Sequence, residues 1–182
     1  MDRETLRQVQ DPLKQQYRDD PEAARLRLVA TSEARGDTPL VCQVNAGGMV
    51  FDVTAHPAVG GSEAAGCSGE QLLGALAACA QITIRMVALA MDIELESVQV
   101  TVQGELDVRG TLGVAQGVEA GFQHIAMEAQ IVTGADRRQQ RALERLVERS
   151  CVVLSTLRRP PPVQSHFTFV TPGGATPAGA ES

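Results

Sequence analysis

The cysteines are the residues of this sequence whose type and spacing could do chemistry. There are four, Cys42, Cys67, Cys79 and Cys151. No two form a CxxC pair, and the three histidines form no HxxxH pair, so no local set has the spacing of a structural zinc site. We therefore expect no metal. The thiols remain as inert core residues or as reactive groups.

Two predicted helices position the most informative pair. Apolar residues recur at helical spacing over 69–91 and place Cys79 mid-helix on an apolar face. Cys151 falls on the apolar face of a second predicted helix over 136–157. Taken alone, both thiols are more often core residues than reactive groups. Cys42 lies on the apolar phase of a strand and reads as core. Cys67 lies in a glycine-rich loop before the first long helix, and its role stays open.

The order of predicted elements indicates an α+β fold with antiparallel strands, because the links between strands have hairpin length. A helix in the first twenty residues starts late or breaks at Pro12, and Ser68 is the expected N-cap of the first long helix, with Gln71 as its capping-box partner. We divide the chain into an N-terminal helical extension (1–20), one domain (21–170) and a disordered tail (171–182). The strands are expected at 25–28, 40–45, 49–54, 98–108, 122–133 and 166–170.

Composition and charge exclude several classes of function. The chain has a net charge of −6, no Trp and only 3% aromatic residues, which argues against a nucleic-acid partner. The first twenty residues are charged throughout, and the apolar stretch 71–91 suits a buried helix better than a membrane span. We expect a cytoplasmic protein without a membrane or nucleic-acid partner. On the second long helix, the exposed arginines with Glu144 and Glu148 are expected to form solvated ion pairs.

The segment CSGEQLLGALAACAQITIRMVA, residues 67–88, resembles the OsmC/Ohr family of osmotically inducible and organic hydroperoxide resistance proteins. That family carries an E-x-L-L-x-A-L-x-x-C helix, on which Glu70 and the reactive Cys79 match. Cys151 in SCVVLSTL resembles the family's second cysteine, although Val152 stands where many relatives have Pro. GELDVRGTLGV and the opening QDPLKQQYRDDPEAA resemble one subgroup, so the similarity covers about residues 20–170.

The resemblance implies an intertwined homodimer in which antiparallel sheets wrap two central helices and the active sites lie at the interface. It implies reduction of organic hydroperoxides without a cofactor: Cys79 becomes a sulfenic acid, Cys151 condenses with it, and an external thiol or dithiol such as a lipoyl group reduces the disulfide. It also implies a hairpin arginine, held by Glu70, that activates Cys79. Arg35 matches best.

Several alternatives remain open at this stage. Arg27 or Arg85 could replace Arg35, which could equally be an exposed turn residue, and Glu70 could simply complement the helix dipole. Cys67 could compete with Cys151 as the resolving thiol. Instead of an enzyme, the chain could be a non-enzymatic thiol sensor or a small-ligand-binding dimer of the same fold, or its cysteines could be purely structural.

Overall fold

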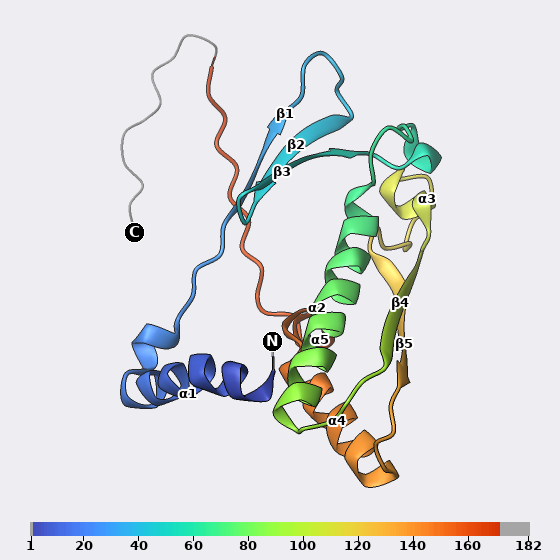
Figure 1. Ribbon diagram of the computed structural model, residues 1–182. Coiled ribbons are helices and arrows are strands. Elements are labelled where there is room, and N and C mark those ends of the chain that lie inside the picture. Colours follow the sequence, from blue (N-terminus) through green and yellow to red (C-terminus); the bar gives the residue numbers. More distant parts are fainter. Residues whose placement is uncertain (1, 172–182) are drawn as a thin grey trace.

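The computed structural model describes residues 2–171, in which two antiparallel sheets flank one long helix (Figure 1). The predicted tail lies outside these residues apart from position 171. The elements are α1 (Arg3–Asp19), a 3-10 turn (Pro21–Ala24), β1 (Ala30–Ala34), β2 (Val41–Ala46), β3 (Met49–Thr54), a second 3-10 turn (Pro57–Val59), α2 (Ser68–Ala90), β4 (Ser97–Leu106), α3 (Val108–Thr111), β5 (Phe122–Val132), α4 (Arg137–Ser150) and α5 (Val152–Arg158). The α+β class predicted from the sequence is confirmed.

The first sheet has the order β1-β2-β3, with both pairs antiparallel. Gly47 and Gly48 adopt positive φ (59° and 79°) in the tight turn between β2 and β3, as predicted. The strand expected at 25–28 is wrong: β1 begins at Ala30, opposite Ala46, where β2 ends and no partner remains for earlier residues. Leu26 and Leu28 are therefore extended but 80% and 82% exposed.

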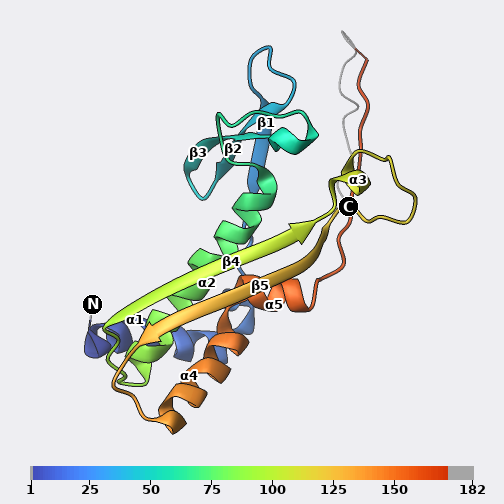
Figure 2. The same ribbon diagram turned by 90° about the vertical axis from the view of Figure 1, so that its right-hand side faces the viewer.

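The central helix α2 begins one residue earlier than expected. Cys67, not Ser68, is the N-cap, because it carries the extended backbone torsions and its N–H donates to the Glu70 carboxylate at 2.8 Å. By length and composition α2 could cross a membrane. In this fold it is instead the helix against which β4, α4 and α5 pack (Figure 2).

The second sheet is a long hairpin of β4 and β5, in register from Ser97 opposite Val132 to a bulge at Glu105 and Leu106. The strand predicted over 98–108 ends at the bulge, and α3 occupies part of the expected glycine-rich loop. One face of the hairpin covers α2 and α4. Two clusters of buried apolar residues form there, one around Ile84 and Leu143 and the other around Leu76 and Leu154.

Three further expectations are corrected. α1 runs unbroken through Pro12, because the carbonyl of Gln8, which Pro12 cannot bond, lies on an exposed helix and is open to water. The helix expected over 136–157 is two helices, separated at Cys151. The strand expected at 166–170 does not form within the described chain, where that segment is extended and exposed.

Candidate active site

The structure brings together two of the cysteines that the sequence places far apart. Cys79 lies in the middle of α2, and Cys151 lies between α4 and α5. The Cys151 thiol donates a hydrogen bond to the Cys79 sulfur, with 3.4 Å between the two Sγ atoms. Cys151 is 0% exposed, whereas Cys79 is half-buried. Leu76 and Leu154 pack against the pair and limit its contact with water.

The break at Cys151 determines how the thiols are surrounded. Cys151 ends α4 and precedes α5 with φ −73° and ψ 109°, an extended geometry that leaves the first amides of α5 without helical partners. Burial raises the pKa of the Cys79 thiol, but hydrogen bonds from the Val153 amide, the Cys151 thiol and the Val152 amide favour the thiolate. Their combined effect exceeds that of burial, so the pKa of Cys79 is lowered.

The pKa of Cys151 shifts in the opposite direction. Burial raises it, the Leu154 amide opposes the rise, and the hydrogen bond and charge of the neighbouring Cys79 raise it further. Cys79 therefore ionises first and Cys151 remains the protonated donor. Cys79 is therefore the better nucleophile of the two, and Cys151 is a protonated thiol beside it.

Thr83 is a member of this site that the sequence reasoning missed. It lies one turn after Cys79 on α2, is 4% exposed, and donates from its hydroxyl to the Cys79 carbonyl at 2.7 Å. The Thr83 hydroxyl lies beside both thiols, and its polarity contributes to lowering the pKa of Cys79 and opposes the rise of the pKa of Cys151. Its position four residues after the cysteine was the available signal, because such positions share a helix face.

The structure does not bring Arg35 or Glu70 to the thiols within residues 2–171. Arg35 forms an ion pair with Asp52 at 3.2 Å on the first sheet. The pKa of Glu70 is lowered because its carboxylate accepts from the backbone N–H of Cys67. Nine residues of α2, about 13 Å of helix, separate Glu70 from Cys79. Their expected roles in activation stay predictions.

The remaining candidates are also away from the pair. Arg27 and Arg85 are exposed, the former in the extended segment before β1 and the latter on α2. Cys67 lines a 320 Å³ hollow at the start of α2 with His56 and Glu70. Cys42 is half-buried on β2 in register with buried Val53. Within residues 2–171, no three histidine, cysteine, aspartate or glutamate side chains gather as a metal site.

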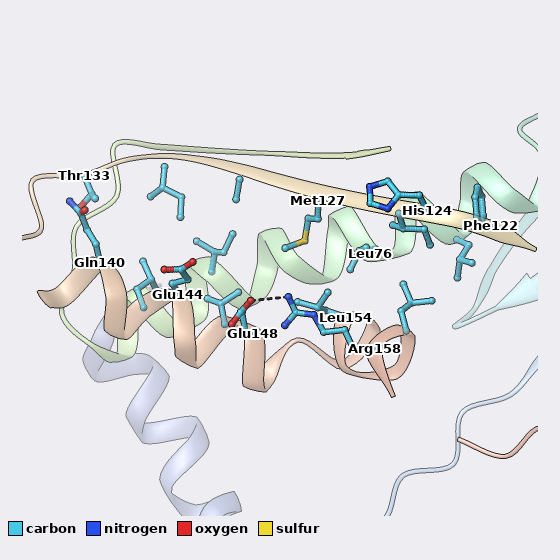
Figure 3. Close-up of a pocket in the computed structure, with 18 of the residues that line it drawn as sticks. Leu76, Phe122, His124, Met127, Thr133, Gln140, Glu144, Glu148, Leu154 and Arg158 are labelled. Carbon is cyan, nitrogen blue, oxygen red and sulfur yellow. Dashed lines mark hydrogen bonds and ion pairs between the residues drawn. The ribbon is translucent and has the colours of Figure 1, made fainter. Parts of the chain in front are cut away.

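A groove of about 940 Å³ runs between β5 and the α4–α5 pair (Figure 3). Its floor includes Leu76, Met127 and Leu154, which also pack around the thiols. Glu148 and Arg158 form an ion pair at 2.8 Å along its rim. The groove thus places an apolar surface directly behind the cysteine pair.

Comparison with known proteins gives this arrangement a family. A family model described as OsmC-like protein matches residues 61–166. The chain belongs to the OsmC family. The family match includes α2, α4 and α5 and both cysteines of the pair, and it begins after the first sheet. No curated protein matches the chain.

Solved structures of the OsmC family share the fold. An OsmC-like protein from Mycoplasma pneumoniae aligns with a TM-score of 0.60 at 19% identity, over 74% of this chain and 89% of that one. An organic hydroperoxide resistance protein OsmC from Legionella pneumophila aligns with a TM-score of 0.56 at 21% identity, over 74% and 90%. One from Elizabethkingia anophelis gives 0.54 at 16%, over 75% and 91%. α1 lies outside the residues that the family model matches.

Proposed function

We propose that this OsmC-family protein is a thiol-dependent peroxidase that reduces organic hydroperoxides, with Cys79 as the peroxidatic and Cys151 as the resolving cysteine. The observation that carries the proposal is the 3.4 Å contact between two thiols whose pKa values shift in opposite directions. Two solved relatives are named organic hydroperoxide resistance proteins, which supports the same substrate class.

The proposed reaction has two steps at the sulfurs. The Cys79 thiolate attacks one oxygen of the hydroperoxide, so an S–O bond forms, the O–O bond breaks, and the alkoxide leaves and takes a proton to become an alcohol. The Cys151 sulfur, losing its proton, then attacks the Cys79 sulfenic acid; the S–S bond forms and water leaves. From 3.4 Å, the sulfurs need to approach to about 2.05 Å, a small movement of α5.

Recycling requires an external reductant. A thiol or dithiol, such as a lipoyl group, attacks the disulfide, is itself oxidised, and returns both cysteines to the thiol state. We place the protein in the cytoplasm, where such reductants keep thiols reduced.

We further propose that the active form is a homodimer, as is typical of the OsmC family. Within residues 2–171, α2 has an uncovered apolar face, on which Ile82 is 66% exposed, one turn from the half-buried Cys79. A second copy covering this face would shield the Cys79 thiolate from bulk water.

The peroxidase proposal is tested by following cumene hydroperoxide consumption with dithiothreitol as reductant. Wild type is expected to turn over, Cys79→Ser to lose activity, and Cys151→Ser to oxidise without forming an intramolecular disulfide. Cys42→Ser is the matched control, because it removes a thiol outside the pair. Equal rates for wild type and C79S would refute the proposal. Rapid formation of the disulfide without turnover would favour the thiol sensor instead.

A further inference from the structure

The outward face of α4 carries a row of arginines that form no ion pair with any other described residue. We define the arginine strip as Arg137, Arg138, Arg141, Arg145 and Arg149, all of which are exposed. The sequence predicted ion pairs on this face, and that prediction is wrong. Within residues 2–171, none of these five arginines has a carboxylate oxygen within 4.0 Å of its guanidinium nitrogens. Glu148 of the same helix pairs instead with Arg158 of α5.

The strip opposes the local stability of its own helix. Arg137, Arg141, Arg145 and Arg149 follow one another at intervals of four residues, where like charges repel. Arg137 and Arg138 occupy the first turn, where the helix dipole disfavours positive charge, and the N-cap Asp136 supplies the negative charge at this end. An acidic protein thus concentrates positive charge where it weakens the helix, which indicates a use for that charge outside the chain.

The strip winds around the helix: each step of four residues turns by about 40°, so the row from Arg137 to Arg149 covers about a third of the helix circumference. It lies opposite the buried residues Leu143 and Val147, which hold α4 against the core. From Arg137 to Arg149 it extends for about 18 Å along the helix axis. Glu144 and Glu148 border it on the side of the groove. α4 lies at the end of the molecule opposite the three-stranded sheet, where no other element of the described chain covers its outer face (Figures 1 and 2).

We propose that the arginine strip is a docking surface for an acidic helix of a partner protein whose carboxylates repeat every four residues. Such a helix presents a carboxylate about every 6 Å along a row that winds in the same way, so the two rows lie along each other where the helices cross at about 50°. The guanidinium fork binds a carboxylate through two parallel hydrogen bonds, so each matched pair adds direction as well as attraction. The proposal concerns a different surface from the thiol pair and does not depend on peroxidase activity.

The shape of the strip favours an acidic helix over other polyanions. Helices that bind membranes insert an apolar face, and the apolar residues of α4 are already buried against α2. A bilayer or a nucleic-acid duplex is wider than the strip, so its negative charges would also meet Glu144 and the rest of this acidic chain, which would repel them. Surfaces that bind single strands use aromatic side chains for stacking, and α4 has none.

The test measures binding of fluorescein-labelled peptides to the full chain by anisotropy. One peptide of about four helical turns carries Glu every four residues, and a second has the same composition with the glutamates spread around the helix. We expect saturable binding of the first at low ionic strength, weaker binding of the second, and loss of affinity as salt shortens the screening length to about 8 Å. R141Q/R145Q is expected to weaken binding of the first peptide about tenfold.

The matched control is R7Q/R18Q, which removes the same charge from exposed positions on α1. This variant should bind the peptide within about twofold of wild type, because it removes only long-range attraction and leaves every arginine of the strip in place. Circular dichroism should show that R141Q/R145Q folds at least as stably as wild type, since it relieves repulsion. Equal binding of both peptides, equal weakening by the control variant, or tighter binding of duplex DNA or of phosphatidylserine vesicles would each overturn the proposal.

Discussion

The backbone amides at the start of α5 are expected to set the reactivity of Cys79, and Val152→Pro isolates one of them. Val152 is the first residue of α5, and its N–H is one of the donors that favour the Cys79 thiolate. Proline removes that N–H yet suits the first position of a helix, and Cys151 already has the extended torsions that a residue before proline requires. The substitution therefore removes a donor and leaves the helix start in place.

The expected effects have opposite signs. A hydrogen bond to a charged group contributes about 1.5–3 kcal/mol; we take the lower end because Cys79 is only half-buried and keeps other donors. Because about 1.4 kcal/mol corresponds to tenfold, alkylation of Cys79 below its pKa should slow about tenfold in V152P. The free energy of unfolding should instead rise by about 0.4–1 kcal/mol, because proline restricts the unfolded chain.

The assay is the rate of iodoacetamide labelling of the Cys79 peptide as a function of pH, read by mass spectrometry, together with urea unfolding. Val152→Ala is the matched control: it shortens the same side chain but keeps the amide, so its labelling profile should follow wild type. If V152P is as stable as wild type and is labelled at the wild-type rate at every pH, the amides of α5 do not activate the thiol.

The remaining predictions concern the surroundings of the pair. Thr83→Val should slow labelling of Cys79 several-fold at fixed pH, because it removes the hydroxyl that helps to lower the pKa of Cys79. Thr83→Ser keeps that hydroxyl and should retain the wild-type profile. Glu70→Gln should lower the urea midpoint at pH 7, and this effect should shrink as the pH falls below the ordinary pKa of a glutamate; the folded-state pKa of this carboxyl is depressed, so its contribution is present above the unfolded pKa and disappears as pH falls through the folded one. Leu154→Ala should cost about 2–5 kcal/mol of unfolding free energy, measured by urea titration, through a cavity beside the thiols. Arg35→Gln tests the role that the family resemblance implies: it should slow hydroperoxide reduction without changing iodoacetamide labelling, because in this fold amides of α5, and not Arg35, lie beside the Cys79 sulfur; equal loss in both assays would contradict this division.

The elements that the sequence predicted well are those whose packing partner lies in the same chain. β3 and β5 alternate apolar and polar residues, and β2, α2 and β4 supply the surfaces that cover them. The segments 25–28 and 166–170 show the same alternation but remain exposed. Alternation of apolar and polar residues indicates that one face of a strand is covered, but it does not indicate whether the same chain or another chain covers that face. These two segments are therefore where a second copy is expected to add strands.

Sequence reasoning singled out the two cysteines that the fold brings together, but it missed Thr83 and the break in the backbone at Cys151. The hydrophobic pattern of 136–157 continues through the break, because Leu143, Cys151 and Leu154 are all buried, so periodicity could not reveal where one helix ends. The hint lay at Val152, where many relatives carry the proline that suits the first residue of a helix.

The break changes what a mid-helix cysteine needs in order to react. From the sequence, Cys79 is distant from the start of its own helix, so lowering its pKa required a cation such as Arg35. In the fold, the start of another helix supplies amides to the same sulfur, and Cys151 is the residue that creates that start. Because the resolving cysteine also positions the donors that ionise its partner, its displacement on oxidation would withdraw those donors from Cys79. Activation and resolution are thus coupled through one backbone turn, and changes to that turn should affect both steps together.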